Sequence, residues 1–226
     1  ETMTHLMNFF ADCHKKAKEE GWEFQIHWYD LMTSSGEKSF KNSLNSQNSS
    51  ILGPDNNKKV DMFFLNYKWG GASLTSSVNM AKRLPRNSYD IFAGFDIQKD
   101  GLNHYGWKSL ANQPISIGFW GAHAQSLLHQ SATDEGTEDI AIQRAYQKKL
   151  ELVFSGGNRN PAFTPELSSG TSLSNTALKK FHGLASYLTA KSTISDVPFV
   201  SRFNLGNGLK FHNEGKVTFN HKWYNL

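Results

Sequence analysis

Apolar residues recur along the chain in a rhythm that predicts strands separated by helices. Near the start, Leu6, Phe10, Cys13 and Ala17 follow one another at spacings of three and four, which predicts a helix that Gly21 can end. Four later runs rich in apolar residues are typical of strands. These runs cover residues 22–30, 60–67, 89–98 and 115–121. The run at 60–67 is almost wholly apolar, which predicts a strand buried on both faces.

The segments between and after these runs complete the predicted order of elements. Helices are predicted over residues 74–84, ending before Pro85, and over residues 140–154. Residues 33–59 are rich in Ser and Asn, which predicts loop and helix of low regularity. Residues 155–176 are rich in Gly, Pro, Ser, Asn and Thr, which predicts a loop. Toward the C-terminus, short β-like runs are separated by turns that contain glycine. Those runs cover residues 197–203, 209–211 and 217–219.

The spacing of the four strand runs favours an α/β fold. One strand about every 25–40 residues, with helical or irregular segments between, is typical of parallel strands joined by helical crossovers. In a (β/α) barrel, the carboxyl ends of such strands meet at one face, where the active site is built. A doubly wound sheet is the alternative, but no glycine-rich phosphate loop follows any strand run. The spacing therefore favours a barrel over the first part of the chain.

Aromatic and acidic residues gather where the predicted strands end. They are Trp28, Tyr29 and Asp30, then Tyr67 and Trp69, then Asp96, and finally Phe119 and Trp120. Flat rings can cover the apolar C–H faces of a sugar, while Asp, Asn and Tyr side chains can bond its hydroxyl edges. A single aromatic residue more often fills the core. Recurrence at four strand ends nevertheless favours a carbohydrate site.

Composition narrows the chemistry further. The 226 residues carry 24 Lys and Arg against 20 Asp and Glu, a formal charge of +4, with short lysine pairs rather than a basic cluster. A nucleic-acid binder is therefore the weakest alternative. Cys13 is the one cysteine, which excludes an internal disulfide and a cysteine-rich metal site, and neither a metal nor a cofactor is expected. No apolar run is long enough to predict a membrane span.

Several strings along the chain are recognisable as motifs. They read HWYDLMTSSG followed by FKNSLN within 27–45, FFLNYKW at 63–69, YDIFAGFDIQ at 89–98, SIGFWG at 116–121 and PFVSRFNLGNGLKF at 198–211. In order and spacing they resemble consecutive motifs of glycoside hydrolase family 85, the endo-β-N-acetylglucosaminidases. The resemblance implies the C-terminal half of a (β/α)8 TIM barrel at residues 1–186. It implies a linker and the start of a β-rich accessory region at residues 187–226.

The resemblance implies an enzyme that cuts between the two core N-acetylglucosamines of N-linked glycans. In this family the 2-acetamido oxygen of the sugar attacks its own anomeric carbon, so configuration is retained without an enzymic nucleophile. A glutamate in an Asn-x-Glu-Thr string protonates the leaving sugar. Because a helix and then Trp28-Tyr29-Asp30 follow Glu1-Thr2, Glu1 maps onto this catalytic acid/base. The matching asparagine and its strand would precede residue 1, so the chain alone is expected to be an inactive fragment.

The resemblance also implies residues that bind the substrate, a glycan or glycoprotein. They are Tyr29, Phe40, Tyr67, Trp69, Asp96, Phe119 and Trp120. Phe40 stands where many members have a tryptophan near the acceptor, and Lys68 replaces what is often an aromatic residue. Two alternatives are a carbohydrate-binding module without catalysis and a chitinase-like hydrolase, whose usual D-x-x-D-x-D-x-E string is missing. Bacterial members imply a secreted or cell-surface protein and animal members a cytoplasmic one, and no motif predicts an oligomeric state.

Overall fold

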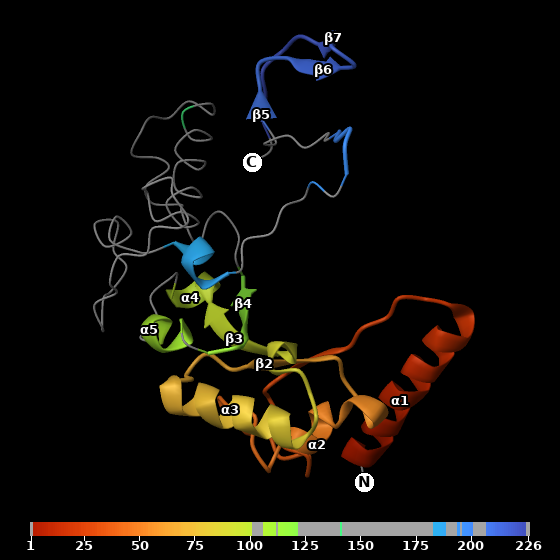
Figure 1. Cartoon of the computed structure of the whole chain (residues 1–226), viewed down its shortest axis with the longest axis vertical. Helices are drawn as coiled ribbons and strands as arrows, with labels where there is room; N and C mark the ends of the chain where they lie inside the picture. The colour runs from red at the N-terminus through yellow and green to blue at the C-terminus, as the bar shows by residue number, and fades with distance from the viewer. Residues whose placement is uncertain are drawn as a thin grey trace. The chain divides into compact units, whose positions relative to one another are not determined.

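The computed structural model describes residues 2–100, 106–111, 113–121, 141, 183–188, 194, 196–200 and 207–224. The chain divides into two compact units. The first is Glu1–His123 with Ser168–Ser172, and the second is Ala124–Leu167 with Leu173–Leu226. The boundary expected between residues 186 and 187 stays a prediction. The first unit holds a parallel sheet with its helices (Figure 1).

Strands and helices alternate along the first unit (Figure 1). Its elements are α1 Thr2–Glu20, β1 His27–Tyr29, α2 Ser49–Leu52, η1 Asp55–Asn57, β2 Met62–Leu65, α3 Gly71–Arg83, η2 Ser88–Asp90, β3 Ile91–Asp96, α4 Ile97–Asp100, α5 Trp107–Leu110 and β4 Ser116–Trp120. The strands form one sheet of order β1-β2-β3-β4, and every neighbouring pair is parallel. The predicted parallel α/β class is therefore confirmed within the described residues.

The start of the chain follows the sequence pattern in its helix but not in its first strand. Gly21 has a φ of 72°, a left-handed conformation that glycine adopts without strain, and α1 ends directly before it. The strand predicted over 22–30 is wrong in its first half, because β1 comprises only His27–Tyr29. Its neighbour β2 begins at Met62, which is the register partner of His27. The Ile26 carbonyl oxygen accepts from the backbone N–H groups of Asp61 at 2.8 Å and Met62 at 3.3 Å, so contact with the start of β2 begins just before β1.

The two faces of the sheet differ in burial. Residues of β2 alternate between buried and half-buried, so the strand run at 60–67 is not buried on both faces as its apolar sequence predicted. The buried face carries Phe63, Leu65, Ile91, Ala93 and Phe95, and α3 adds the buried side chains Leu74, Val78 and Ala81. Helix α3 contacts β3, so it covers this face. A hydrophobic core thus lies between one face of the sheet and α3.

On the opposite face, the ring of Phe64 occupies space left by two glycines. Gly94 of β3 and Gly118 of β4 are register partners, and a Cβ atom on either would collide with this ring. At Gly94 the added carbon would also collide with the Leu65 carbonyl oxygen, which belongs to the backbone and cannot rotate away. The two glycines therefore allow three strands to pack closely around one aromatic side chain.

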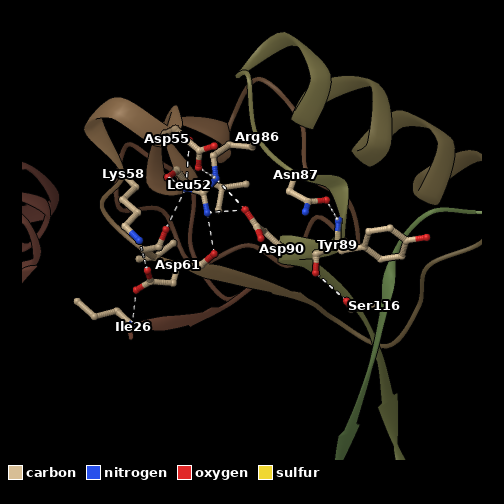
Figure 2. Close-up of polar contacts among 12 residues, drawn as sticks. Ile26, Leu52, Asp55, Lys58, Asp61, Arg86, Asn87, Tyr89, Asp90 and Ser116 are labelled. Carbon is tan, nitrogen blue, oxygen red and sulfur yellow. Dashed lines mark hydrogen bonds and ion pairs between the residues drawn. The ribbon is translucent and has the colours of Figure 1, made fainter. Parts of the chain in front are cut away.

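The guanidinium of Arg86 holds the amino ends of the strands through the contacts drawn in Figure 2. The Arg86 side chain is 2% exposed. It donates to the carbonyl oxygens of Leu52 at 3.0 Å and Asp61 at 2.7 Å. It also pairs with the carboxylate of Asp90 at 2.9 Å. Asp61 directly precedes β2 and Asp90 directly precedes β3. One buried cation thus joins the entry points of two neighbouring strands.

The carboxylate of Asp61 is a second anchor at the amino ends (Figure 2). It accepts from the Ile26 backbone N–H at 2.7 Å and from Lys58 Nζ at 2.6 Å, and His14 Nε2 lies 3.3 Å away. Burial by itself would raise the pKa of the Asp61 carboxyl. The hydrogen bonds and the positive charges of Lys58 and His14 outweigh burial and hold this pKa below its usual value. The approach to β1 is therefore tied to the start of β2 by a charged group.

In the second unit, the described strands form two short antiparallel pairs. β5 Asn207–Gly208 pairs with β8 Trp223–Tyr224, and β6 Phe211–Asn213 pairs with β7 Lys216–Phe219. The turn of the second pair is Glu214-Gly215, with φ values of 50° and 78°. Two successive positive φ values give the turn that suits the twist of a two-residue hairpin. The predicted β-like runs at 209–211 and 217–219 are confirmed in this pair, the first only at its last residue.

The other predictions for the second unit are either wrong or lie outside the described residues. The β-like run predicted at 197–203 is wrong at its described residues 197–200, which form no strand. The irregular segment at 155–176 and the helix at 140–154 lie outside the described residues, apart from Ala141. A short helical turn, η4 Leu184–Tyr187, was not predicted.

Candidate functional site

The candidate site lies at the carboxyl ends of the sheet strands, where aromatic side chains surround Tyr29, the last residue of β1. The ring centroid of Tyr29 is 6.0 Å from that of Phe40, 6.0 Å from that of Phe64 and 5.8 Å from that of Tyr67. Phe40 is 45% exposed, so one ring of the group faces solvent. The structure thus brings together three of the predicted site residues, namely Tyr29, Phe40 and Tyr67.

A chain of hydrogen bonds runs from Tyr29 into the following loops. The Tyr29 hydroxyl donates to Asn66 Oδ1 at 2.6 Å. Asn66 Nδ2 donates to Asn42 Oδ1 at 2.7 Å, and the Lys68 backbone N–H donates to the same oxygen at 3.0 Å. The Tyr67 hydroxyl is also hydrogen-bonded to that of Tyr29. The phenol at the end of β1 is therefore held by groups from two separate segments.

Burial and nearby carboxylates keep the two phenols neutral. Burial is the largest cause that raises the pKa of Tyr29, and the negative charges of Asp30 and Asp96 raise it further against the hydrogen bond from Tyr67. Burial likewise raises the pKa of Tyr67, with added contributions from Tyr29 and Asp96. Both hydroxyls are therefore uncharged hydrogen-bonding groups at neutral pH.

Asp30 is a fully buried carboxylate that fastens the loop after β1. It accepts from the Asn42 backbone N–H and, at 3.3 Å, from Asn48 Nδ2, and the backbone N–H groups of Lys41 and Asn66 also donate to it. Burial raises the pKa of this carboxyl despite these donors. Because its oxygens are enclosed by protein donors, Asp30 serves to shape the loop rather than to meet a ligand.

Asp96 and Trp120 extend the site along the carboxyl ends of β3 and β4. They are register partners, and alternation along β3 places Asp96 on the same face as Gly94, over which the Phe64 ring lies. One oxygen of Asp96 accepts from the Lys99 backbone N–H at 3.2 Å. Trp120 is 58% exposed, so it presents a second accessible ring. Both predicted residues therefore lie on the face that carries Tyr29.

Trp69 lies in the core, and the half-buried Phe119 lies on the opposite face of the sheet from Tyr29. Trp69 is fully buried, its indole N–H donates to the Gly94 carbonyl at 2.7 Å, and its ring centroid is 5.2 Å from that of Phe95. The Phe119 ring packs against Phe95 at 5.6 Å. Strand alternation explains Phe119, since its neighbours in the strand point to the other face. The buried Trp69 ring is therefore not placed to cover a sugar, and Phe119 packs against the core ring of Phe95.

The predicted catalytic residue, Glu1, lies outside the described residues. Its assignment as acid/base therefore stays a prediction.

Sequence reasoning missed the amides that orient the tyrosines. Asn42 and Asn66 lie within the FKNSLN and FFLNYKW strings, so the signal was a short amide close to aromatic residues in each string. Their mutual hydrogen bond joins residues 24 positions apart, which no local pattern reveals. In the described part of the chain, no three His, Cys, Asp or Glu side chains are grouped to hold a metal ion. No helix there combines the length and hydropathy that crossing a membrane requires.

The arrangement suits a neutral ligand with both apolar faces and hydroxyl edges. Phe40 and Trp120 offer accessible flat rings on this face, and Tyr29 and Tyr67 offer uncharged hydroxyls in the group that contains Phe40. Sugars have this pairing of C–H faces and polar edges, so ring packing and hydrogen bonding can act on them together. Asp96 adds a partly buried carboxylate at the same face.

Comparisons with known proteins point to one family. A family model described as glycosyl hydrolase family 85 matches residues 1–211. Among solved structures, the chain resembles the glycoside hydrolase domain of Endo-D from Streptococcus pneumoniae, with a TM-score of 0.72 and 22% sequence identity. The match covers 98% of this chain and 33% of that one, so this chain spans about a third of the length of the structure it matches. A search of curated proteins gives no match.

Proposed function

The chain belongs to glycosyl hydrolase family 85, and from that premise we propose that it carries part of the catalytic site of an endo-β-N-acetylglucosaminidase. The substrate is an N-linked glycan, and the bond cut is the GlcNAc-β-1,4-GlcNAc link of its core. The observation that carries the proposal is the group of Tyr29, Tyr67 and Phe40 at the carboxyl ends of a parallel sheet. Barrel enzymes build their active sites at that end of their strands.

The proposed mechanism uses the substrate's own acetamido group. Its carbonyl oxygen attacks the anomeric carbon as the bond to the leaving sugar breaks, and Glu1 gives a proton to the leaving oxygen. The resulting oxazoline-type ring is opened when water attacks the same carbon and returns a proton to the Glu1 carboxylate. Two inversions give net retention. A nucleophile already joined to the substrate loses little further freedom on reaction.

The burial of Asp30 beside Tyr29 supports this scheme over one in which Asp30 is the nucleophile. Asp30 is fully buried and its oxygens accept from several protein donors, so it is not free to attack a sugar. Tyr29 remains neutral at pH 7, which suits a group that orients the acetamide without adding charge.

We propose further that turnover needs a sheet closed into a (β/α)8 barrel, of which the four described strands are a part. An open parallel sheet leaves unpaired N–H and C=O groups along its outer strands. The 226-residue chain by itself is therefore expected to release no glycan. Glycan release by the 226-residue chain and glycan release by the full natural protein are therefore measured in separate assays.

The test is cleavage of a high-mannose glycopeptide followed by mass spectrometry. The full natural protein should leave the peptide with one N-acetylglucosamine, and Glu1→Gln should lower kcat by at least about 100-fold, as expected when a general acid is lost. Glu23→Gln is the matched control, since Glu23 is an exposed glutamate outside the group around Tyr29. Equal activity in the two variants would reject Glu1 as acid/base, and binding without cleavage would favour a non-catalytic carbohydrate module.

A further inference from the structure

We infer that Asn42 is a positioning residue that fixes the direction of the hydrogen bond between Tyr29 and Asn66, so that Tyr29 presents an acceptor to the substrate. This inference rests on the proposed function for the identity of the ligand, but its hydrogen-bond geometry stands by itself. With this hydrogen-bond direction, the Tyr29 oxygen would accept from a sugar hydroxyl or an acetamido N–H and would not donate to a carbonyl group.

One group in this chain of hydrogen bonds, a backbone N–H, can act only as a donor. The nitrogen and oxygen of an asparagine side chain are easily interchanged in a structure, so their roles must come from their partners. A backbone N–H can only donate, and the N–H of Lys68 contacts the side chain of Asn42 at 3.0 Å. The contacting atom of Asn42 must therefore be its oxygen.

The direction of every other bond in the chain follows. Because Asn42 presents an oxygen, Asn66 must turn its NH2 group toward it, at 2.7 Å. The carbonyl oxygen of Asn66 then faces Tyr29, whose hydroxyl must donate, at 2.6 Å. With its proton committed to Asn66, Tyr29 can only accept from Tyr67. The opposite effects of this bond on the pKa of the two phenols agree, since it lowers that of Tyr29 and raises that of Tyr67.

The backbone at Asn42 explains why this amide holds its place. Its φ is 53°, a left-handed conformation that Asn and Gly adopt far more readily than other residues. Its backbone N–H donates to the buried Asp30 carboxylate. The side chain is therefore fixed by a constrained backbone as well as by its own hydrogen bonds. Glycine can keep this backbone without the amide, so Asn42→Gly removes the side chain without straining the backbone.

The experiment follows the Tyr29 hydroxyl proton by NMR in the full natural protein at pH 7, with no sugar present. In the unmodified protein, the proton should be resolved in slow exchange and coupled to the side-chain carbonyl carbon of Asn66. In Asn42→Gly the coupling should be lost and the hydroxyl proton should exchange at least about tenfold faster, because Asn66 is free to rotate. Asn42→Asp keeps an acceptor oxygen and should retain the coupling.

Each outcome decides the inference. Unchanged coupling in a folded Asn42→Gly variant would overturn it, and so would equal loss in Asn42→Asp. If Asn42→Gly does not fold, the spectrum of the unmodified protein still tests the inference. Absence of the coupling between the Tyr29 hydroxyl proton and Asn66 would contradict the proposed direction of the hydrogen bond. In the full natural protein, kcat should fall in Asn42→Gly and recover in part in Asn42→Asp. A protein without glycosidase activity but with the predicted NMR result would reject the proposed function and leave the hydrogen-bond assignment standing.

Discussion

Replacing Arg86 by methionine should weaken the fold severely while leaving the groups around Tyr29 in place. Methionine keeps most of the apolar stem and removes the guanidinium, which is almost wholly buried and makes the contacts drawn in Figure 2. The change leaves the carbonyl oxygens of Leu52 and Asp61 without their donor and Asp90 without its cation. These groups lie where the strands begin, at the end of the sheet opposite to Tyr29.

The expected loss follows from the partners that Arg86 leaves behind. Arg86 donates to the carbonyl groups of Leu52, Gly53, Val60 and Asp61, and the two shortest of these hydrogen bonds, to Leu52 and Asp61, contribute about 1–2 kcal/mol each. Asp90 is 27% exposed, so water restores part of its solvation, and its loss adds roughly 1 kcal/mol. The free energy of unfolding should therefore fall by about 3–5 kcal/mol, which is also the range for breaking a buried ion pair on one side.

Urea unfolding of the 226-residue chain, followed by tryptophan fluorescence at pH 7, measures this loss. Asp55→Asn is the matched control, because Asp55 also pairs with Arg86, at 3.1 Å, but is 69% exposed. It should change the free energy of unfolding by no more than about 0.5 kcal/mol. A loss under about 1 kcal/mol in Arg86→Met, or a similar loss in both variants, would refute the idea that the buried guanidinium holds the strand ends.

Three further predictions concern the packing, the charge and the exposed ring. Gly118→Ala should lower the free energy of unfolding by about 1–3 kcal/mol in urea, and adding Phe64→Leu should restore part of that loss. No such rescue is expected for Gly94→Ala, because its new carbon also collides with backbone, and equal rescue of both variants would contradict this packing. Because the pKa of Asp61 is lowered by folding, its stabilisation is present above its unfolded pKa and lost as pH falls through the folded value. The stability difference between the unmodified chain and Asp61→Asn should therefore be steady near neutral pH and shrink below about pH 4, and a difference independent of pH would contradict the shift. Phe40→Ala should weaken N,N′-diacetylchitobiose binding about tenfold in calorimetry. Because the ring is 45% exposed, the variant should lose little stability, and an unchanged affinity would exclude this ring from the site.

The parallel sheet could be predicted from sequence because its strands carry strong local signals. The runs that became β2, β3 and β4 are apolar and bounded by polar or glycine-containing segments. The first strand was predicted too long, because its aromatic alternation reaches back to Trp22 while its partner begins only at Met62. Strand length depends on the neighbour's register, and a neighbour far along the chain leaves no mark on the local pattern.

The site could be predicted as a region but not as a set of contacts. The aromatic strand ends pointed to the region where the structure brings Tyr29, Phe40 and Tyr67 together. They could not separate Tyr67 from Trp69, which is two positions along and fully buried, because that choice depends on a hydrogen bond to Gly94. The direction of the hydrogen bonds around Tyr29 likewise depends on pairs brought together by the fold alone.

The anchors at the two ends of the sheet have different chemistry. At the amino ends, Arg86 and Asp61 are charged groups paired with backbone and with opposite charges. At the carboxyl ends, the side chains around Tyr29 are mostly neutral rings, hydroxyls and amides. In barrel enzymes the amino end serves stability and the carboxyl end serves chemistry. This division between the two ends agrees with a site for a neutral sugar at one end only.

The most direct test of the central claim varies the nucleophile on the substrate itself. N-glycan core substrates in which the reacting N-acetyl group carries zero, one, two or three fluorine atoms have a progressively weaker carbonyl nucleophile. If the acetamido oxygen attacks the anomeric carbon, kcat of the full natural protein should fall with each added fluorine, by at least about 100-fold across the series. A kcat that does not change across the series would contradict substrate-assisted catalysis and, with it, the proposed role of Tyr29 in orienting the acetamide.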